Sequence, residues 1–392
     1  MSVINPVTDL AKDAEIAVIT LNSPPVNALS EIMREGLIAA LAQAEADDAV
    51  QATLLICAGR TFIAGADISE FDKKQTGASL RDVQDAMDAA KKPIVVAIHG
   101  TALGGGLETA MCGHYRVAVP SAKLGQPEVA LGLVGAGGTQ RLPRLIGVAK
   151  ALEMVTDGKP ITAEEGLTLG LLDALMPEKE LKEGALAFTR QLLAAGKGIR
   201  RTRDRNEKVT GIAPQLFAEF RASHNFRGFE APGEAIRCIE AAATMPFDRG
   251  LDFEAEVFLA CMGSLQSKAQ RYAFFAERKA SKIPGLADDT PILPVAKVGV
   301  VGAGLMGGGI ATVFANAGLP VTIVEADAAA LAKGLGAIQG NFESSVKRGR
   351  LSEAEARTRF GRIAGTLKLD DLASCDLIVE AVFENMAGKK DI

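Results

Sequence analysis

The sequence predicts an α/β protein in which a first part of alternating strands and helices is followed by a helical stretch and then by a doubly wound part. Three observations predict this. Short β-type runs alternate with helical periods between residues 15 and about 180. The pattern from about 181 to 281 is nearly all helical. An apolar strand over 298–301 then runs directly into a glycine-rich turn, and 392 residues are enough for two or three domains.

The individual elements of the first part follow from local patterns. The runs 16–21, 53–57 and 94–98 have the length and the β-branched content of strands. Ser30 is placed as the N-cap of a helix that carries Met33, Leu37 and Leu41 on one face. Residues 234–244 and 265–281 are the clearest helices of the second stretch.

Three prolines, Pro284, Pro291 and Pro294, follow the last of these helices and prevent a helix from continuing. They predict a linker. The expected division is therefore a first domain over 1–190, a helical extension over 191–281, a linker over 282–296 and an incomplete nucleotide-binding domain over 297–392.

The last part carries a dinucleotide-binding fingerprint. The strand from Val298 enters a G-x-G-x-x-G turn made by Gly302, Gly304 and Gly307, and a second strand ends at Glu325, 23 residues after Gly302. The first glycine allows the tight turn, the second lets the backbone approach a pyrophosphate, and the third lets the helix pack closely on the strand. The free N–H groups at the helix start then favour an anion.

Composition excludes several classes of function. The chain is 48% hydrophobic and 23% charged, its net charge is −5, and it has no long basic run, so a nucleic-acid partner is not expected. No apolar stretch is long enough for a membrane span, and the start lacks a secretory signal. The five cysteines lie far apart without a C-x-x-C pair, which predicts reduced thiols in a cytosol-like compartment and no metal site.

Two glycine-rich turns of the first part have the features of a catalytic site. Residues 62–68 and 100–108 each follow a strand, and the second opens a helix. Free N–H donors converging from two such turns would form an oxyanion hole. Glu108 and Glu128 lie 20 residues apart, so only tertiary folding can bring them together. Burial among apolar neighbours would raise the pKa of each carboxyl and suit it to proton transfer near neutral pH.

Four motifs in this order resemble the crotonase (enoyl-CoA hydratase/isomerase) family. They are A-G-A-D-I from residue 64, G-x-A-L-G-G-G-x-E from 100, G-Q-P-E from 125 and G-A-G-G-T-Q-R-L from 135. Together with the later glycine turn, the chain resembles the multifunctional fatty-acid β-oxidation enzymes, in which a hydratase half precedes an L-3-hydroxyacyl-CoA dehydrogenase half. The resemblance implies a spiral of ββα units, a helical extension and an incomplete Rossmann domain.

The resemblance also implies roles for residues of the first part. The N–H groups of Ala66 and Gly105 would form the oxyanion hole for a thioester oxygen, and Ala64 and Ile68 would contact the substrate. Glu108 and Glu128 would hold and activate a water molecule. Glu128 would also protonate the α-carbon, so that a trans-2-enoyl-CoA becomes a 3-hydroxyacyl-CoA. The same groups would support Δ3–Δ2-enoyl-CoA isomerisation, and the presence of both acids favours the hydratase.

In the last part, the resemblance implies NAD as the cofactor and a coenzyme A thioester as the substrate, with no metal. It places Met306 beside the dinucleotide, Glu325 on the adenosine ribose, and further contacts on Val382, Phe383, Glu384 and Lys389. Dehydrogenase activity is expected only in a longer chain, because the catalytic histidine of the resembled enzymes lies beyond this segment, and His99, His114 and His224 all precede the linker.

Two alternatives remain open at this stage. The chain could be an isomerase only, in which case Glu108 would be dispensable, or a non-catalytic fragment that binds coenzyme A or a partner chain. The expected partners are the acyl-CoA substrate and, in the context of the family, a further copy of the chain or a thiolase. The expected location is the cytoplasm, or the peroxisome in a eukaryote.

Overall fold

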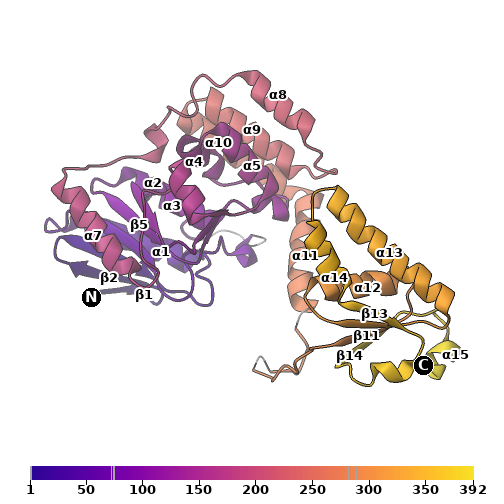
Figure 1. Cartoon of the computed structure of the whole chain (residues 1–392). Coiled ribbons are helices and arrows are strands. Elements are labelled where there is room, and N and C mark those ends of the chain that lie inside the picture. Colours follow the sequence, from indigo (N-terminus) through magenta and orange to yellow (C-terminus); the bar gives the residue numbers. More distant parts are fainter. Residues whose placement is uncertain (1, 72, 74–75, 281, 288) are drawn as a thin grey trace. The chain divides into compact units, whose positions relative to one another are not determined.

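A computed structural model describes residues 2–71, 73, 76–280, 282–287 and 289–392 of the chain. Figure 1 shows the chain and labels many of its helices and strands. The chain divides into two compact units, Met1–Lys282 and Ile283–Ile392. Each unit has its own hydrophobic core, so each is described by itself.

The first unit alternates strands with helices, as the sequence predicts. Its strands are β1 (Ser2–Asn5), β2 (Thr8–Asp13), β3 (Ile16–Leu21), β4 (Ala52–Cys57), β5 (Ile94–Ile98), β6 (Thr101–Leu103), β7 (Tyr115–Ala118), β8 (Lys123–Gly125), β9 (Ile161–Thr162) and β10 (Ala174–Leu175). Its helices are α1 (Glu31–Ala46), α2 (Leu80–Ala89), α3 (Gly105–Cys112), α4 (Gly138–Ile146), α5 (Val148–Asp157), α6 (Ala163–Leu169), α7 (Leu181–Ala194), α8 (Pro214–Ser223), α9 (Ala231–Thr244), α10 (Phe247–Gly263) and α11 (Leu265–Ala280). Short 3₁₀ turns are η1 (Ile68–Glu70), η2 (Glu128–Leu131) and η3 (Thr202–Asp204).

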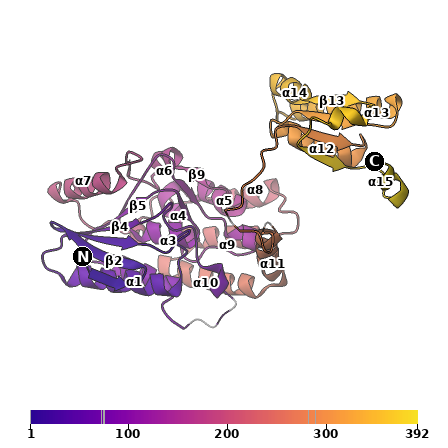
Figure 2. The ribbon, with the colours of Figure 1, turned by 90° about the horizontal axis from the view of Figure 1, so that it is seen from below.

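A seven-stranded sheet in the order β1-β2-β3-β4-β5-β7-β10 forms the centre of this unit. The β1–β2 and β2–β3 pairs are antiparallel, and the pairs from β3 to β10 are parallel. All residues of β4 and β5 are buried, as expected of strands covered on both faces. Figure 2 shows α1 and α7 on opposite sides of the sheet. A smaller sheet has the order β6-β8-β9, and its strand β6 directly precedes the glycine run that begins at Gly104.

The helices beyond residue 190 belong to the same compact unit as the strands. Helices α9 and α10 pack against α4, and α9 also packs against α5. Ile236, Ile239 and Val257 from these helices lie in one core cluster with the residues of the sheet. The finer division, with a boundary at 190 and a separate helical extension, therefore remains a proposal.

Most expected elements have close counterparts. The expected strands 16–21 and 94–98 coincide with β3 and β5, and 53–57 lies within β4. Ser30 occupies the N-cap of α1, although its side chain makes no capping hydrogen bond. Helix α11 covers 265–280 of the expected 265–281, and residue 281 lies outside the described residues. In the described part of 282–296 the chain forms no helix or strand.

The second unit is a parallel sheet with helices. Its elements are β11 (Val298–Val301), α12 (Leu305–Asn316), β12 (Val321–Val324), α13 (Ala328–Lys347), α14 (Glu353–Phe360), β13 (Ile363–Thr366), η4 (Leu369–Leu372), β14 (Leu377–Glu380) and α15 (Met386–Asp391). The strands pair in the order β13-β12-β11-β14, all in parallel. Because the strands are parallel, their carboxyl ends meet at one edge of the sheet, where this class of fold binds its ligands.

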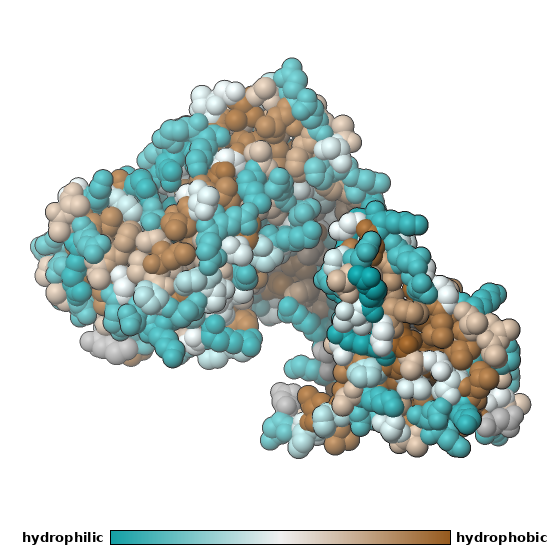
Figure 3. Space-filling model, in the orientation of Figure 1, coloured by the Kyte–Doolittle hydropathy of each residue, from teal (hydrophilic) through white to brown (hydrophobic). Residues whose placement is uncertain are grey.

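Figure 3 shows hydrophilic and apolar residues mixed over the visible face of each unit. Among the residues that the structure describes, no helix is both long enough and apolar enough to cross a membrane.

We expect limited proteolysis to cut the chain first between residues 282 and 297. The described residues there are almost all exposed and lie outside helices and strands, so few backbone hydrogen bonds oppose cleavage. Mass spectrometry of the products should identify a fragment ending near Lys282, and its circular dichroism should remain that of a folded α/β protein. First cuts within 62–142, or an unfolded N-terminal fragment, would contradict this prediction.

Candidate functional site

Two separate turns of the first unit bring the backbones of Ala66 and Gly105 close together. Ala66 follows Gly65, whose φ is +130°, and Gly105 follows Gly104, whose φ is +50°. A Cβ atom added to Gly105 would lie 3.5 Å from the Ala66 nitrogen. Neither N–H donates to an acceptor within the described residues. Two free donors that border one small space can stabilise a developing oxyanion.

Close contacts made possible by glycine bring these turns together. A Cβ atom on Gly106 would lie only 2.1 Å from the Ile63 carbonyl oxygen, so a side chain there would push α3 away from the 62–66 segment. A Cβ atom on Gly104 would lie 2.8 Å from Glu128 Oε1. The glycine run therefore places both the N-terminus of α3 and the Glu128 carboxyl beside Gly105.

Glu108 lies in the first turn of α3 and is 1% exposed. Its Oε1 accepts hydrogen bonds from the N–H groups of Ala136 (2.6 Å) and Gly138 (3.0 Å). Burial raises the pKa of Glu108 to about 7, although the two N–H donors and the charge of Arg141 act in the opposite direction. A carboxyl with this pKa can exchange a proton near neutral pH.

Glu128 begins η2 and is half-buried. Burial, and next the charge of Glu108, raise its pKa well above the ordinary value of a glutamate. The structure therefore brings Glu108 and Glu128 close enough to influence each other's ionisation. Two carboxyls with different environments can divide the roles of base and acid.

A third acid, Glu254 of α10, was not anticipated from the sequence. It is 1% exposed, and its carboxyl accepts hydrogen bonds from Gly137 N–H (2.7 Å), Thr139 N–H (2.8 Å) and Thr139 Oγ1 (2.7 Å). Burial, and next the charge of Glu108, raise the pKa of Glu254 to about 8. A signal was available, because Glu254 lies on the buried stripe of α10 with Leu251 and Val257.

Gln126 completes this polar cluster. It is 1% exposed, and its Nε2 donates to the Gly104 carbonyl oxygen at 3.2 Å. Its Oε1 has no hydrogen-bond partner among the described residues. A buried acceptor in this state can accept a hydrogen bond from a protonated neighbouring carboxyl or from a bound water.

The two residues expected to contact substrate lie just before η1 and at its first position. Ala64 is half-buried, and its N–H donates to the Val26 carbonyl oxygen at 3.2 Å. Ile68 is half-buried and begins η1, which Asp67 caps by accepting a hydrogen bond from Ser69 N–H. Both therefore flank Ala66 in sequence, and the assigned contact with substrate remains a prediction.

The glycine turn of the second unit has the contacts expected of a nucleotide-binding turn. Gly302 has a φ of +101°, and a Cβ atom on Gly307 would lie 1.9 Å from the Gly302 carbonyl oxygen. No atom lies within 4 Å of a Cβ added to Gly304, which is the N-cap of α12. The turn is therefore open where a phosphate would approach, and tight where helix and strand meet.

Glu325 follows β12 and contacts the same turn. Its Oε2 accepts from Ala303 N–H and its Oε1 from Ala326 N–H, both at 2.8 Å. Met306 is 72% exposed on the first turn of α12. The structure thus brings the glycines, Met306 and Glu325 to one edge of the sheet, as the fingerprint predicts.

The segment after β14 reaches the same edge, because β14 pairs with β11. The Val382 N–H donates to Glu380 Oε1 at 2.7 Å, and Phe383 is 89% exposed. Lys389 Nζ forms ion pairs with Glu380 at 3.0 Å and with Glu384 at 2.9 Å. The pairing of β14 with β11 places these residues near the glycine turn of the second unit. Their contact with a dinucleotide remains a prediction.

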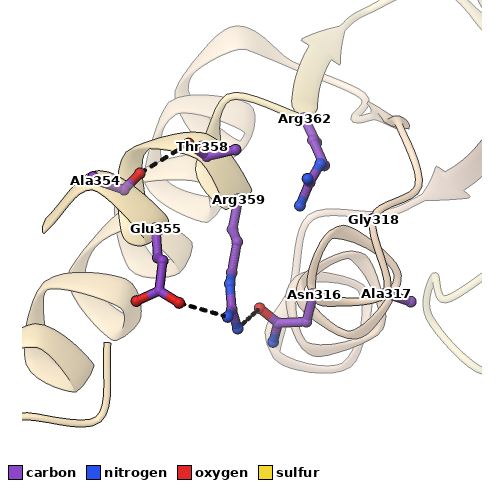
Figure 4. A pocket seen from close by; sticks show the side chains of 8 residues that line it. All are labelled: Asn316, Ala317, Gly318, Ala354, Glu355, Thr358, Arg359 and Arg362. Atoms are coloured by element: carbon purple, nitrogen blue, oxygen red, sulfur yellow. Dashed lines mark hydrogen bonds and ion pairs between the residues drawn. The ribbon is translucent and has the colours of Figure 1, made fainter. Parts of the chain in front are cut away.

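A pocket in the second unit lies away from this turn. It is formed where the C-terminal end of α12 meets α14, and in Figure 4 Arg359 points toward both Glu355 and Asn316. Arg359 donates to Asn316 Oδ1 at 3.2 Å and pairs with Glu355 at 3.7 Å. Since Gly304 precedes the other end of α12, this pocket is not the nucleotide-binding turn. Among the described residues no group of three or more His, Cys, Asp or Glu side chains could hold a metal ion.

Comparisons with known proteins agree with this geometry. The enoyl-CoA hydratase/isomerase family profile matches residues 11–216, and the profile of the 3-hydroxyacyl-CoA dehydrogenase NAD-binding domain matches 297–392. The chain is similar to the peroxisomal bifunctional enzyme of Danio rerio (39% identity, 96% of this chain and 52% of the relative). It is also similar to a peroxisomal fatty acid β-oxidation multifunctional protein of Arabidopsis thaliana (36% identity, 96% and 54%).

The chain spans about half the length of these curated relatives. Among solved structures it is similar to an enoyl-CoA hydratase/isomerase from Pseudoalteromonas atlantica (TM-score 0.53, 23% identity, 72% of this chain and 100% of that one). It is also similar to a carnitinyl-CoA hydratase from Mycobacterium avium (TM-score 0.53, 24% identity, 70% and 97%). These structures confirm the expected crotonase-type fold. Since the first profile covers more than half of the sequence, the chain belongs to the enoyl-CoA hydratase/isomerase family.

Proposed function

We propose that the first unit hydrates trans-2-enoyl-CoA thioesters to 3-hydroxyacyl-CoA in fatty-acid β-oxidation. The observation that carries this proposal is the pair of free N–H groups on Ala66 and Gly105, which lie close together beside two carboxyls of raised pKa, Glu108 and Glu128. The family and the names of the similar bifunctional and multifunctional enzymes support the same reaction.

The chemistry follows from where charge develops. Addition of water to the double bond moves negative charge onto the thioester oxygen, and the Ala66 and Gly105 N–H groups stabilise that charge. Ionised Glu108 accepts a proton from the attacking water at its carboxylate. Glu128, whose pKa is raised further by the charge of Glu108, keeps its proton and delivers it to the α-carbon. The water oxygen bonds to the β-carbon, and the C=C bond becomes a single bond.

Isomerisation of a Δ3-enoyl-CoA to the Δ2 form is a second reaction of the same site. The N–H pair would stabilise the dienolate, and Glu128 would move the proton along the acyl chain. This reaction does not need Glu108 as a base for water. A role restricted to binding coenzyme A would show no conversion of either substrate.

In the second unit, NAD fits the open turn at Gly304. The N-terminus of α12 would hold the pyrophosphate, and Glu325 would bind the ribose hydroxyls in place of its present backbone donors. NAD supplies a hydride acceptor for oxidation of the 3-hydroxyacyl-CoA. We propose that this oxidation is the activity of a longer chain, as the name of the similar bifunctional enzyme and the matching 3-hydroxyacyl-CoA dehydrogenase NAD-binding profile suggest.

The relatives also suggest where the protein acts and what it contacts. The similar enzymes are peroxisomal by name, so we propose a peroxisomal location in a eukaryote and a cytoplasmic one otherwise. The acyl-CoA substrate follows from the family. A thiolase, which would consume the oxidised product, and a second copy of the chain are the proposed protein partners.

Glu128→Gln should abolish hydration of crotonyl-CoA, and Glu108→Gln should reduce it severely. Each change keeps the size of the side chain and removes only its ability to exchange a proton, which is worth about 10²–10⁴ in rate. The loss of enoyl-thioester absorbance measures turnover. The exposed acid Glu164, changed to Gln, is the matched control and should retain activity. Near-normal turnover by Glu128→Gln would refute the assignment, and full activity of Glu108→Gln in isomerisation alone would favour the isomerase.

Gly105→Val should remove turnover while the chain stays folded. A Cβ atom there makes only ordinary contacts of 3.5 Å, so the backbone can accept it, but the branched methyl groups would cover the Ala66 N–H. Loss of one oxyanion donor costs about 10²–10³ in kcat. Gly198→Val, at an exposed position with open space around the added Cβ, is the control. A folded and fully active Gly105→Val variant would show that Gly105 does not meet the thioester.

The rate of hydration should depend on pH with an acid and an alkaline limb. Below about pH 7 Glu108 becomes protonated and cannot accept a proton from water, so kcat/KM should fall as the pH is lowered. At higher pH Glu128 loses the proton that the α-carbon needs, so kcat/KM should fall again. Because the two carboxyls interact, the limbs report the pair. A rate that is constant from pH 5 to 7 would contradict the role of Glu108.

A further inference from the structure

Residues 136–139, which form the turn at the start of α4, donate their four consecutive N–H groups to two different carboxyls. Ala136 and Gly138 donate to Glu108, while Gly137 and Thr139 donate to Glu254. The donors therefore alternate between an acid of α3 and an acid of α10. The sequence motifs assign no role to Glu254, the second of these acids.

On its carbonyl side the turn is held by Gln84, whose Nε2 donates to the Ala136 carbonyl oxygen at 2.6 Å. On its N–H side it is held by the two carboxyls. Gly137 has a φ of +106°, and a Cβ atom on Gly138 would lie 2.0 Å from Gln126 Oε1 and 2.6 Å from Glu108 Oε1. Glycine is required for space at Gly138, and it also leaves the turn free to adopt other conformations. Within the part of the chain that the structure describes, the side chain that accepts from Gly137 N–H is Glu254, at 2.7 Å.

We propose that Glu254 is a positioning residue for the hydration reaction: by binding Gly137 and Thr139, it fixes the turn so that the Ala136 and Gly138 N–H groups meet Glu108. This inference rests on the proposed function and deepens it. Glu254 does not need to touch substrate. It acts through the backbone of the turn, and it makes α10 part of the catalytic apparatus of the first unit.

The electrostatic surroundings support this role. A Cβ atom on Gly135 would lie 2.8 Å from Glu108 Oε1 and 3.3 Å from Glu254 Oε1, so the two carboxyls border the same glycine. The charged or titratable groups that act on them are Arg141 of α4, which pairs with Asp88 of α2, together with Glu128 of η2, Cys238 of α9 and Cys112 of α3. Burial raises the pKa of Glu254, and the charge of Glu254 is not among the causes that shift the pKa of Glu108.

Loss of Glu254 should therefore affect Glu108 mainly through the N–H groups and not through charge. The Ala136 and Gly138 donors favour the ionised form of Glu108 and lower its pKa. If the turn is released, these hydrogen bonds weaken and the pKa of Glu108 rises. A role of Glu254 limited to capping the helix would change stability and leave this pKa where it is.

Glu254→Gln in the 392-residue chain tests the inference. In this variant the glutamine amide nitrogen replaces one carboxyl oxygen, and it cannot accept a hydrogen bond. One of the two backbone N–H groups that donate to Glu254 would therefore face another donor. We expect kcat for crotonyl-CoA to fall by about 10²-fold, as for misplacement of a catalytic group, with little change in KM. We also expect the acid limb of the pH profile to move to higher pH. Glu256→Gln, an exposed acid on the same helix, should behave as the parent chain.

Thr139 provides a second and milder test. Its hydroxyl donates to Glu254 Oε1 at 2.7 Å, while its backbone N–H would remain in any variant. Thr139→Val should lower kcat and move the acid limb in the same direction by a smaller amount, and Thr139→Ser should restore both. If near-ultraviolet circular dichroism shows that Glu254→Gln is unfolded, this pair decides the question.

The outcomes separate the inference from the proposed function. A parent chain that does not hydrate crotonyl-CoA would refute the proposed function itself. An active parent, with a folded Glu254→Gln variant that keeps its kcat and acid limb and loses only thermal stability, would refute the positioning role. If Glu254→Gln is unfolded, the positioning role would be refuted by a Thr139→Val variant whose kcat and acid limb equal those of Thr139→Ser.

Discussion

The hydrogen bonds between the first turn of α4 and two buried carboxyls are the interaction on which the candidate active site depends. A carboxyl taken out of water loses several kcal/mol of hydration unless donors replace the solvent. Four consecutive N–H groups, two just before α4 and two in its first turn, supply that replacement for Glu108 and Glu254. The site can thus hold acids in an apolar interior, where their pKa values lie near neutrality.

Glycine makes both glycine-rich sites possible for the same physical reason. In the first unit, Gly106 lets α3 approach the Ile63 carbonyl, and this contact brings the backbones of Ala66 and Gly105 close together. In the second unit, Gly307 lets α12 approach the Gly302 carbonyl, which opens the turn at Gly304 to a phosphate. In each case a side chain would separate a helix from the preceding backbone and disperse the N–H groups that face the ligand.

Much of this arrangement could be predicted from local sequence. The strands 16–21 and 94–98, the helix after Ser30 and the glycine turns follow from patterns of two to ten neighbouring residues, and tertiary packing did not override them. The family could be inferred from four motifs because each preserves a backbone requirement. The position of the helices beyond 190 could not be predicted, because an amphipathic pattern shows that a face is buried but not which surface covers it.

By itself, the sequence determined the α/β class, the two glycine turns, the order of the motifs and the candidate acids Glu108 and Glu128, because these depend on residues close together in the chain. Only the tertiary structure decided which groups surround those acids. Glu254 receives its hydrogen bonds from residues more than 100 positions earlier, and Glu325 receives one from Ala303 across two parallel strands. Burial and hydrogen bonding set the pKa values of such acids, and both arise from packing between distant segments, which local patterns do not encode.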